Sequence, residues 1–246
     1  MGLLSHFLGD DQKLSRPNFN RYRHIELDFS GNKIRFIDAK HTAMYPLNTW
    51  PENIDIYNTD KLNGSDAGDY AKLFYVRGWA LRGRNQSSVG SCNVESLIFY
   101  FPNSHSKNIN CFNKKDFELE LIRYCHDMWG WNNRGSKMGS LGSGDHTYPV
   151  KSSELSYKKI NEITWCHFTS QYKGDSPEIV YATPISKNHI LINSFSLQAH
   201  ECYHFYSPET NLEQTSYDVM RDFMDQYHIE LSPRSVSERS EVDDPI

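Results

Sequence analysis

The stretch YRHIELDFSGNKIRFIDA, residues 22–39, carries the clearest folding signal in the chain. Its apolar residues recur at every second position, with Leu27 and Phe29 before a Ser-Gly-Asn triplet and Ile34 and Phe36 after it. Alternation of period two is typical of strands with one buried face, and glycine beside asparagine favours a tight turn. The stretch therefore predicts a β-hairpin. Its strands are Tyr22–Phe29 and Lys33–Ala39, joined by Ser30-Gly31-Asn32.

Further runs rich in β-branched and aromatic residues predict more strands on both sides of a central helix. These strands are Lys72–Leu81, Val94–Phe101, Ile163–Gln171, Ile179–Pro184 and His189–Tyr206. Apolar residues at steps of three and four predict helices at Asp116–Trp129 and Leu212–His228. We expect Asn113 to cap the first helix and Gly130 to end it. Residues 46–70 and the turn 82–91 are predicted as loops, and the polar tail 231–246 is expected to fray.

The order of these elements is strands, helix, strands, helix, with neighbouring strands joined by hairpins. This order predicts an α+β fold with antiparallel sheet and two main helices. A chain of 246 residues can form a single compact domain over 1–246. Two similar sheet-plus-helix halves, 20–130 and 150–231, are a further expectation, joined by the loop 134–145 that is rich in Gly and Ser.

Composition narrows the class of protein. The chain has 26 Lys and Arg against 31 Asp and Glu, a net charge of −5, so we expect no nucleic-acid partner. No stretch approaches the roughly 20 apolar residues of a membrane span. The apolar start 1–9 lacks the positive region of a signal peptide. We therefore expect no membrane partner and a cytoplasmic location. The 5 cysteines form no C-x-x-C pair, which indicates reduced, buried thiols.

One motif matches a catalytic pattern: His200-Glu201-Cys202-Tyr203-His204 has the form H-E-x-x-H. In zinc proteases this spacing needs a helix, which aims both imidazoles at the metal. Here a strand-like run precedes the motif, and a strand would place His200, Cys202 and His204 on one face and Glu201 on the other. We therefore expect no catalytic residue, no metal and no cofactor. Two alternatives stay open: a zinc-dependent hydrolase using His200, Glu201 and His204, and a non-catalytic metal site of His200, Cys202 and His204.

Other candidate motifs lack the context that their chemistry needs. The glycines of 139–144 stand in the wrong order for a dinucleotide-binding turn. Asp145-His146 and His126-Asp127 could act as acid–base pairs, but the chain has no G-x-S-x-G motif that would supply a serine nucleophile. Cys166 and His167 point to opposite faces of a predicted strand. We therefore predict a protein that is not an enzyme.

The acidic, aromatic segments predict a surface for a partner protein. Tyr and Trp beside carboxylates are common anchors at protein interfaces. The alternative is that these residues are solvated acids and ordinary core aromatics. The candidate partner-binding residues are Trp50, Glu52, Asp55, Tyr57, Asp60, Asp66, Asp69, Tyr70, Trp129 and Trp131.

Several stretches give the chain a general similarity to a known class. They are Trp50–Tyr57, Leu73-Phe74-Tyr75, Asn110–Asn113, Ala182–Ser186 and Ile229–Pro233. In this pattern the chain resembles uncharacterised gammaproteobacterial proteins of the toxin-immunity type. The resemblance implies a non-enzymatic inhibitor that binds a cognate toxin and occludes its active site. The net negative charge of the chain fits a toxin with a basic surface, because complementary charges speed the association of two proteins.

Overall fold

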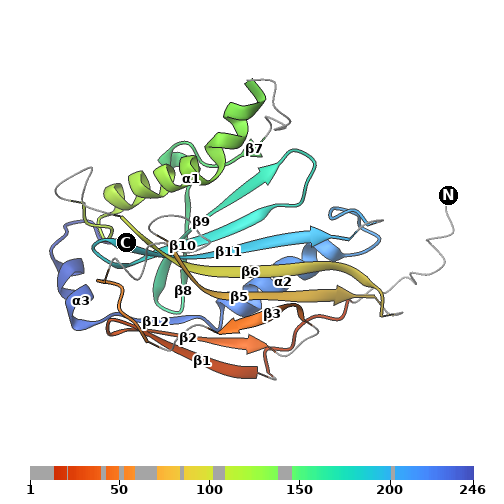
Figure 1. Cartoon of the computed structure of the whole chain (residues 1–246), viewed down its shortest axis with the longest axis horizontal. Helices are drawn as coiled ribbons and strands as arrows, with labels where there is room; N and C mark the ends of the chain where they lie inside the picture. Colours follow the sequence, from red (N-terminus) through yellow and green to blue (C-terminus); the bar gives the residue numbers. More distant parts are fainter. Residues whose placement is uncertain are drawn as a thin grey trace.

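The computed structural model describes residues 14–20, 22–39, 43–49, 53–58, 71–83, 86–101, 109–137, 146–200 and 203–246, with backbone only for 22, 43–49 and 131–137. The strands are β1 (Tyr22–Phe29), β2 (Asn32–Ala39), β3 (Ala43–Thr49), β4 (Asn53–Ile54), β5 (Ala71–Arg82), β6 (Ser88–Tyr100), β7 (His146–Thr147), β8 (Ser156–Ile160), β9 (Ile163–Tyr172), β10 (Glu178–Ser186), β11 (His189–Ala199) and β12 (His228–Glu230). The helices are α1 (Lys114–Lys137), α2 (Leu212–Met224) and α3 (Pro233–Ser240), with a 3-10 turn at Ser152–Glu154. The predicted α+β class is confirmed (Figure 1).

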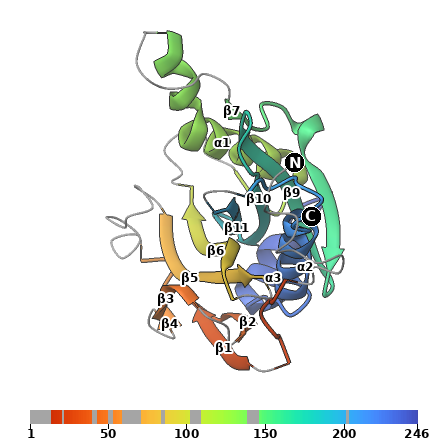
Figure 2. The ribbon, with the colours of Figure 1, turned by 90° about the vertical axis from the view of Figure 1, so that its right-hand side faces the viewer.

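The strands form two sheets. The central sheet has the order β3-β5-β6-β11-β10-β9, and both β7 and β8 pair with β9. The small sheet has the order β12-β2-β1-β4 and lies at the opposite end of the molecule from the end of α1 (Figure 2). Strands from both expected halves share the central sheet, since β6 pairs with β11 from Tyr100↔His189 to Gly90↔Ala199. Whether the halves 20–130 and 150–231 are copies of one unit stays a prediction.

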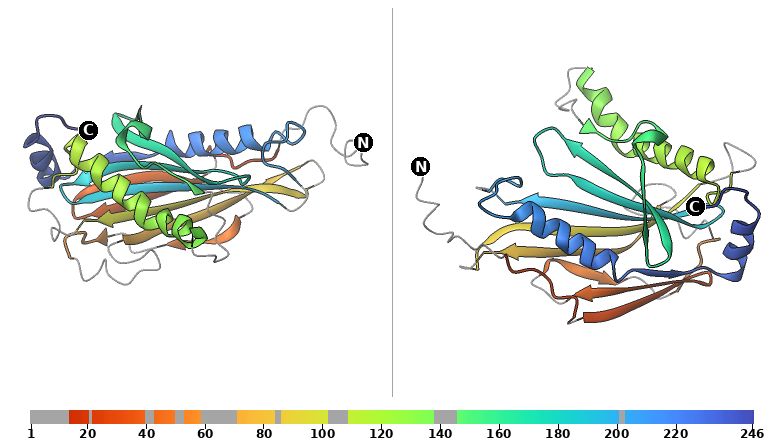
Figure 3. Two further views of the ribbon diagram at one scale, coloured as in Figure 1. Left: turned by 90° about the horizontal axis from the view of Figure 1, so that it is seen from above. Right: turned by 180° about the vertical axis from the view of Figure 1, so that it is seen from behind.

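Two hydrophobic cores lie on opposite faces of the central sheet. The first lies against α2 and the small sheet, where Phe36 stacks on Tyr227 with ring centroids 5.2 Å apart and Trp79 meets Phe223 at 5.9 Å. The second lies under α1, which buries Phe117 and Leu121 against the other face. Seen from above, α1 and α2 flank the central sheet on its two sides (Figure 3). No helix within the described residues is long and apolar enough to cross a membrane.

The predicted hairpin is confirmed as β1 and β2, with Leu27 opposite Ile34. Its turn is shorter than predicted, because Asn32 already belongs to β2. Ser30 and Gly31 take the left-handed conformation (φ 54° and 89°) that suits a two-residue hairpin turn. The Asn32 side chain is buried and donates to the Phe29 carbonyl oxygen (3.0 Å). It also accepts a hydrogen bond from the Ser232 N–H (2.9 Å), so the turn is tied to the segment before α3.

A predicted helix end and a predicted turn both differ from the structure at a glycine. Gly130 does not end α1, which continues to Lys137. A Cβ atom at Gly130 would lie 3.1 Å from the Tyr148 hydroxyl, so this glycine permits close packing instead. Gly90 lies inside β6 rather than in the predicted turn 82–91. A Cβ atom there would lie 2.8 Å from a Leu212 methyl, so only glycine fits this close approach. Asn113 caps α1 as predicted, accepting from the Lys115 and Asp116 N–H groups at 3.1 and 3.2 Å.

Segments predicted as irregular contain regular structure. Residues 43–49 and 53–54, mostly inside the predicted loop, form β3 and β4 through pairing with β5 and β1. The tail 231–246 does not fray: Ser232 caps α3 by accepting from Ser235 N–H (3.1 Å). The Ile246 N–H donates to the Phe112 carbonyl oxygen (3.0 Å), which holds the last residue against the start of α1. Long-range pairs of this kind are invisible in the local sequence pattern.

Two predicted elements end early. α2 stops at Met224, and residues 228–230 leave the helical path to pair with β2 as β12. β11 stops at Ala199 rather than Tyr206. The first core still uses the residues beyond the helix, because Tyr227 is fully buried.

Candidate functional site

The face of the central sheet beneath α1 changes from apolar to polar along its strands. Residues directly opposite each other in antiparallel strands share one face. One cross-strand row is apolar and lies in the core under α1: Cys166, Ala182, Ile192 and Leu97. The row four residues away is polar: Ser170, Glu178, Ser196 and Asn93. Between these rows, Ser194 of β11 lies opposite Glu95 of β6. We call these six polar residues (Ser170, Glu178, Ser194, Ser196, Asn93 and Glu95) the polar floor.

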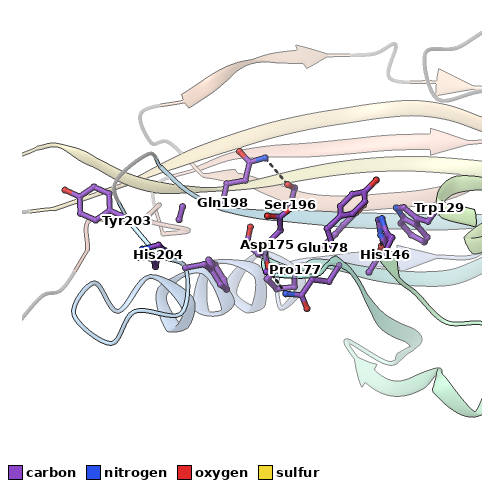
Figure 4. Close-up of a pocket in the computed structure, with 16 residues that line it drawn as sticks. Trp129, His146, Asp175, Pro177, Glu178, Ser196, Gln198, Tyr203 and His204 are labelled. Carbon is purple, nitrogen blue, oxygen red and sulfur yellow. Dashed lines mark hydrogen bonds between the residues drawn. The ribbon is translucent and has the colours of Figure 1, made fainter. Parts of the chain in front are cut away.

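A pocket of about 660 Å³ is lined by part of the polar floor, namely Ser170, Glu178 and Ser196. This volume is within the roughly 300–1,000 Å³ of small-molecule sites. His146 and Trp129 lie together at one end of the pocket, and Tyr203 and His204 at the other (Figure 4). The chain segment between β9 and β10 closes one side and contributes Asp175.

Three aromatic rings form a wall beside the floor. Trp129 of α1 and His146 of β7 have ring centroids 6.0 Å apart, and His146 and Tyr172 of β9 are 4.0 Å apart. Trp129 also meets Phe168 edge-on at 6.1 Å, which anchors it in the second core. We call Trp129, His146 and Tyr172 the aromatic wall. Trp129 reaches this wall because α1 is capped at Asn113 and packs along the sheet through its apolar stripe.

His146 and Ser170 form a close pair at the junction of wall and floor. His146 Nε2 lies 2.6 Å from Ser170 Oγ, and both side chains are buried. Burial lowers the pKa of His146, because the charged imidazolium loses hydration. The imidazole is therefore neutral at pH 7, and the pair presents hydrogen-bonding groups to the pocket without adding positive charge.

Glu178 is the charged group of the floor. Its Oε1 accepts a short hydrogen bond from the Ser194 hydroxyl. Burial raises the pKa of Glu178, and the nearby Glu95 carboxylate raises it further. Hydrogen bonds from Ser194 and Trp129 oppose this rise by favouring the carboxylate. Within the described part of the chain, no Lys or Arg forms an ion pair with Glu178, nor does any line the pocket. The charged lining residues are Asp175 and Glu178.

The structure separates the predicted partner-binding residues that it describes. Trp129 is buried in the second core and lines the pocket. Asp55 accepts from the Ser30 hydroxyl (2.9 Å) and the Tyr57 N–H (3.1 Å), so its carboxylate holds a turn. Tyr57 lies under the Arg234 guanidinium, 3.7 Å from its ring centroid. Trp131 lies in α1, and its side chain is outside the described residues. The residues wholly outside the described ranges are Trp50, Glu52, Asp60, Asp66, Asp69 and Tyr70.

The described residues of the H-E-x-x-H match, His200, Tyr203 and His204, lie on neither the helix that zinc proteases need nor the predicted strand. His200 follows the end of β11 and donates its N–H to the Val89 carbonyl oxygen (3.0 Å). Tyr203 N–H donates to the His200 carbonyl oxygen (2.9 Å). His204 is exposed at the rim of the pocket. Glu201 and Cys202 lie outside the described residues, and the described ones contain no group of three or more His, Cys, Asp or Glu placed to hold a metal.

The described cysteines are buried, as predicted: Cys92, Cys111, Cys125 and Cys166. Burial raises the pKa of Cys166 to about 12, so its thiol is protonated at pH 7. Cys166 packs in the second core, whereas His167 of the same strand faces Tyr181 of the first core at 5.7 Å. This confirms that the neighbouring Cys and His point to opposite faces.

Sequence reasoning did not identify any residue of the polar floor. The signal lay in the even positions of β11, which change from Ile190 and Ile192 to Ser194 and Ser196. The odd positions stay apolar except for His189 and Asn193. Glu178 stood just outside a predicted strand, and only pairing with β9 brings it beside Ser170. His146 was noticed, but its partner Ser170 is 24 residues away in sequence.

Comparisons with protein-family models, with curated proteins and with solved structures found no match for this chain. The chemistry of the pocket is therefore the basis on which a function can be assigned.

Proposed function

We propose that this chain is a non-enzymatic binding protein that neutralises a cognate toxin by occluding it, as an immunity protein does. The toxin would present a basic surface, and the pocket over the polar floor would receive part of it. The observation that carries this proposal is the half-buried Glu178 carboxylate, which lines a pocket without a paired cation among the described residues.

An ionised carboxylate that is partly removed from water without a counter-charge is unfavourable in the free protein. A cation supplied by a partner would compensate that cost and gain the full charge-assisted interaction. The aromatic wall supports the same function, because Trp and Tyr at a pocket are typical anchors of interface energy. The net charge of −5 would also steer a basic partner toward the protein. We propose a cytoplasmic location, with neither nucleic acid nor membrane as a partner.

The test is complex formation with the product of the neighbouring gene, on the hypothesis that it encodes the toxin. Co-expressed proteins should co-purify and give a one-to-one complex at micromolar concentration, with loss of toxin activity. Glu178→Gln should weaken the complex. The matched control Glu162→Gln, at the β8–β9 turn and so at the far end of β9 from the pocket, should not. A neighbour that is not toxic, or the absence of a complex at micromolar concentration, would overturn the proposal.

The alternative is a zinc-dependent hydrolase that uses His200, Glu201 and His204. The observation in its favour is that His204 lines the same pocket as Glu178. Metal analysis of the purified protein tests it, because a working site retains zinc through purification. Less than about 0.2 zinc per chain would remove this alternative. So would equal hydrolytic activity of wild type and the Glu201→Gln variant.

A further inference from the structure

The polar floor, of which Ser170, Glu178 and Ser196 line the pocket, is rich in hydrogen-bond acceptors. Glu178 and Glu95 flank Ser194, whose hydroxyl donates to Glu178. Asn93, directly opposite Ser196, has 9% of its surface exposed, and its Oδ1 has no hydrogen-bond partner. A buried amide oxygen without a donor is unfavourable and marks a place where a donor is missing. Two carboxylates and one amide oxygen without a donor therefore lie on the same face, and no Lys or Arg among the described residues pairs with Glu178.

The wall beside this floor is aromatic and uncharged. Tyr172 packs on His146 at 4.0 Å, and His146 lies 6.0 Å from Trp129. His146 is kept neutral by burial, so the wall does not repel a cation. Aromatic faces attract cations, and a planar guanidinium gains most because it also stacks.

We infer that the pocket receives the guanidinium group of an arginine side chain, supplied by the partner protein. This inference rests on the proposed function and names the chemistry of its contact. The guanidinium would bind the Glu178 carboxylate and lie against the aromatic wall. It has five N–H donors, enough to serve the carboxylate and the neighbouring polar atoms at once.

Two other cations fit the pocket less well. A lysine ammonium is a compact, strongly hydrated charge that cannot bind a carboxylate in a bidentate manner or stack on a ring. A calcium ion takes six to eight oxygen ligands, and the described residues contain no group of three or more acidic, Cys or His side chains that could hold a metal. Both serve as competing ligands in the test.

The test uses the full chain and small probes, so it does not depend on knowing the toxin. Nα-acetyl-arginine amide is titrated into the protein, and the indole N–H signal of Trp129, assigned with a Trp129→Phe variant, is followed by NMR. We expect saturation with a Kd on the order of 1 mM. Nα-acetyl-citrulline amide has nearly the same shape and no charge, and should bind at least tenfold more weakly. Glu178→Gln should weaken arginine binding by roughly tenfold, and Glu162→Gln should leave it unchanged.

The outcomes separate this inference from the proposed function. Equal binding of the arginine and citrulline probes, no binding of either, or tighter binding of the lysine analogue or calcium chloride would overturn the inference. A toxin complex that forms equally well with Glu178→Gln would overturn it and would remove the pocket as the contact site, while leaving neutralisation of the toxin by binding standing. Arginine binding at the pocket without any complex with the toxin would support the inference about the pocket and overturn the proposed function.

Discussion

Ser170 of β9 and Glu178 of β10 lie directly opposite each other, on the face of the central sheet that α1 partly covers. Opposed residues in an antiparallel pair have Cβ atoms about 4.5–5.5 Å apart. Ser170 is held by His146, and Glu178 by Ser194, so the two side chains join the aromatic wall to the carboxylate of the floor. Polar side chains occupy positions here at which apolar ones could be buried. Such a loss of stability is common where a protein binds a ligand.

The first prediction concerns the effect of the Glu178 carboxylate on the free energy of unfolding. Its pKa is raised in the folded protein, chiefly by burial, so the native state keeps this proton to higher pH than the unfolded chain does. Stability therefore falls as pH rises above the usual value of 4.5. Glu178→Gln should stabilise the protein at pH 7.5 by about 0.5–2 kcal/mol. The gain should shrink toward zero below pH 4.5.

Urea unfolding of wild type and Glu178→Gln at two pH values checks this. Glu162→Gln is the control, because that side chain is 90% exposed in its ion pair with Lys159. Its effect should stay within about 0.5 kcal/mol at both pH values. Loss of stability in Glu178→Gln at pH 7.5 would mean that the carboxylate is already compensated in the free protein.

His189 gives a prediction of opposite sign. The side chain is 1% exposed and lies 2.6 Å from Ser186 Oγ through Nδ1. Burial lowers the pKa of His189 from 6.5 to about 4, so the unfolded chain binds this proton first as pH falls. Wild type should therefore lose about 3 kcal/mol from this residue between pH 6.5 and pH 4. To measure this loss, the free energy of unfolding is plotted against pH for wild type and for His189→Gln, and the two slopes are compared.

Both proteins share the carboxylates that titrate in that range, so the difference isolates the histidine. The variant should be less stable than wild type at pH 7.5, since His189 packs between Tyr57 and Tyr100. If the curves of unfolding free energy against pH were parallel for the two proteins, His189 would not be held as a buried, neutral imidazole.

Gly90 should be intolerant of a side chain. A Cβ atom there would lie 2.8 and 2.9 Å from the two Leu212 methyls and would also collide with the Gln198 carbonyl oxygen. Because that oxygen belongs to the backbone of β11, the strand pair itself would have to shift. Gly90→Ala should cost about 1–3 kcal/mol in unfolding free energy. Thermal or urea unfolding measures it, and a neutral effect would contradict the close approach of α2 to β6.

Local patterns predicted the elements whose signals are local. The hairpin 22–39 follows from period-two alternation, and the start of α1 follows from Asn113, whose Oδ1 caps the helix. The errors arose where a distant contact overrides a local preference. Gly130 looks like a helix end, yet it accommodates Tyr148. The tail looks disordered by composition, yet Ile246 pairs with Phe112.

The candidate site was less predictable than the fold because its residues meet only through sheet register. Ser170, Glu178 and Ser196 lie on three strands, and each one alone is an ordinary surface residue in the sequence. A shift of one residue in either pairing would turn one of these side chains to the other face. Of the predicted partner-binding residues, Trp129 does line the pocket, as a buried ring rather than an exposed anchor.

The last prediction links His146 to the charge of the pocket. Burial lowers the pKa of His146 below 6.5, so its NMR titration should have a midpoint under that value. Protonation of His146 at lower pH would place a positive charge beside Glu178, and Glu178 itself would begin to gain a proton. Both changes disfavour a cationic ligand, so binding of Nα-acetyl-arginine amide should weaken as pH falls from 7.5 to 5. In His146→Gln the contribution of His146 is removed, so the pH dependence should become shallower. A midpoint above 6.5, or arginine binding that strengthens at pH 5, would contradict the assigned charges of both residues.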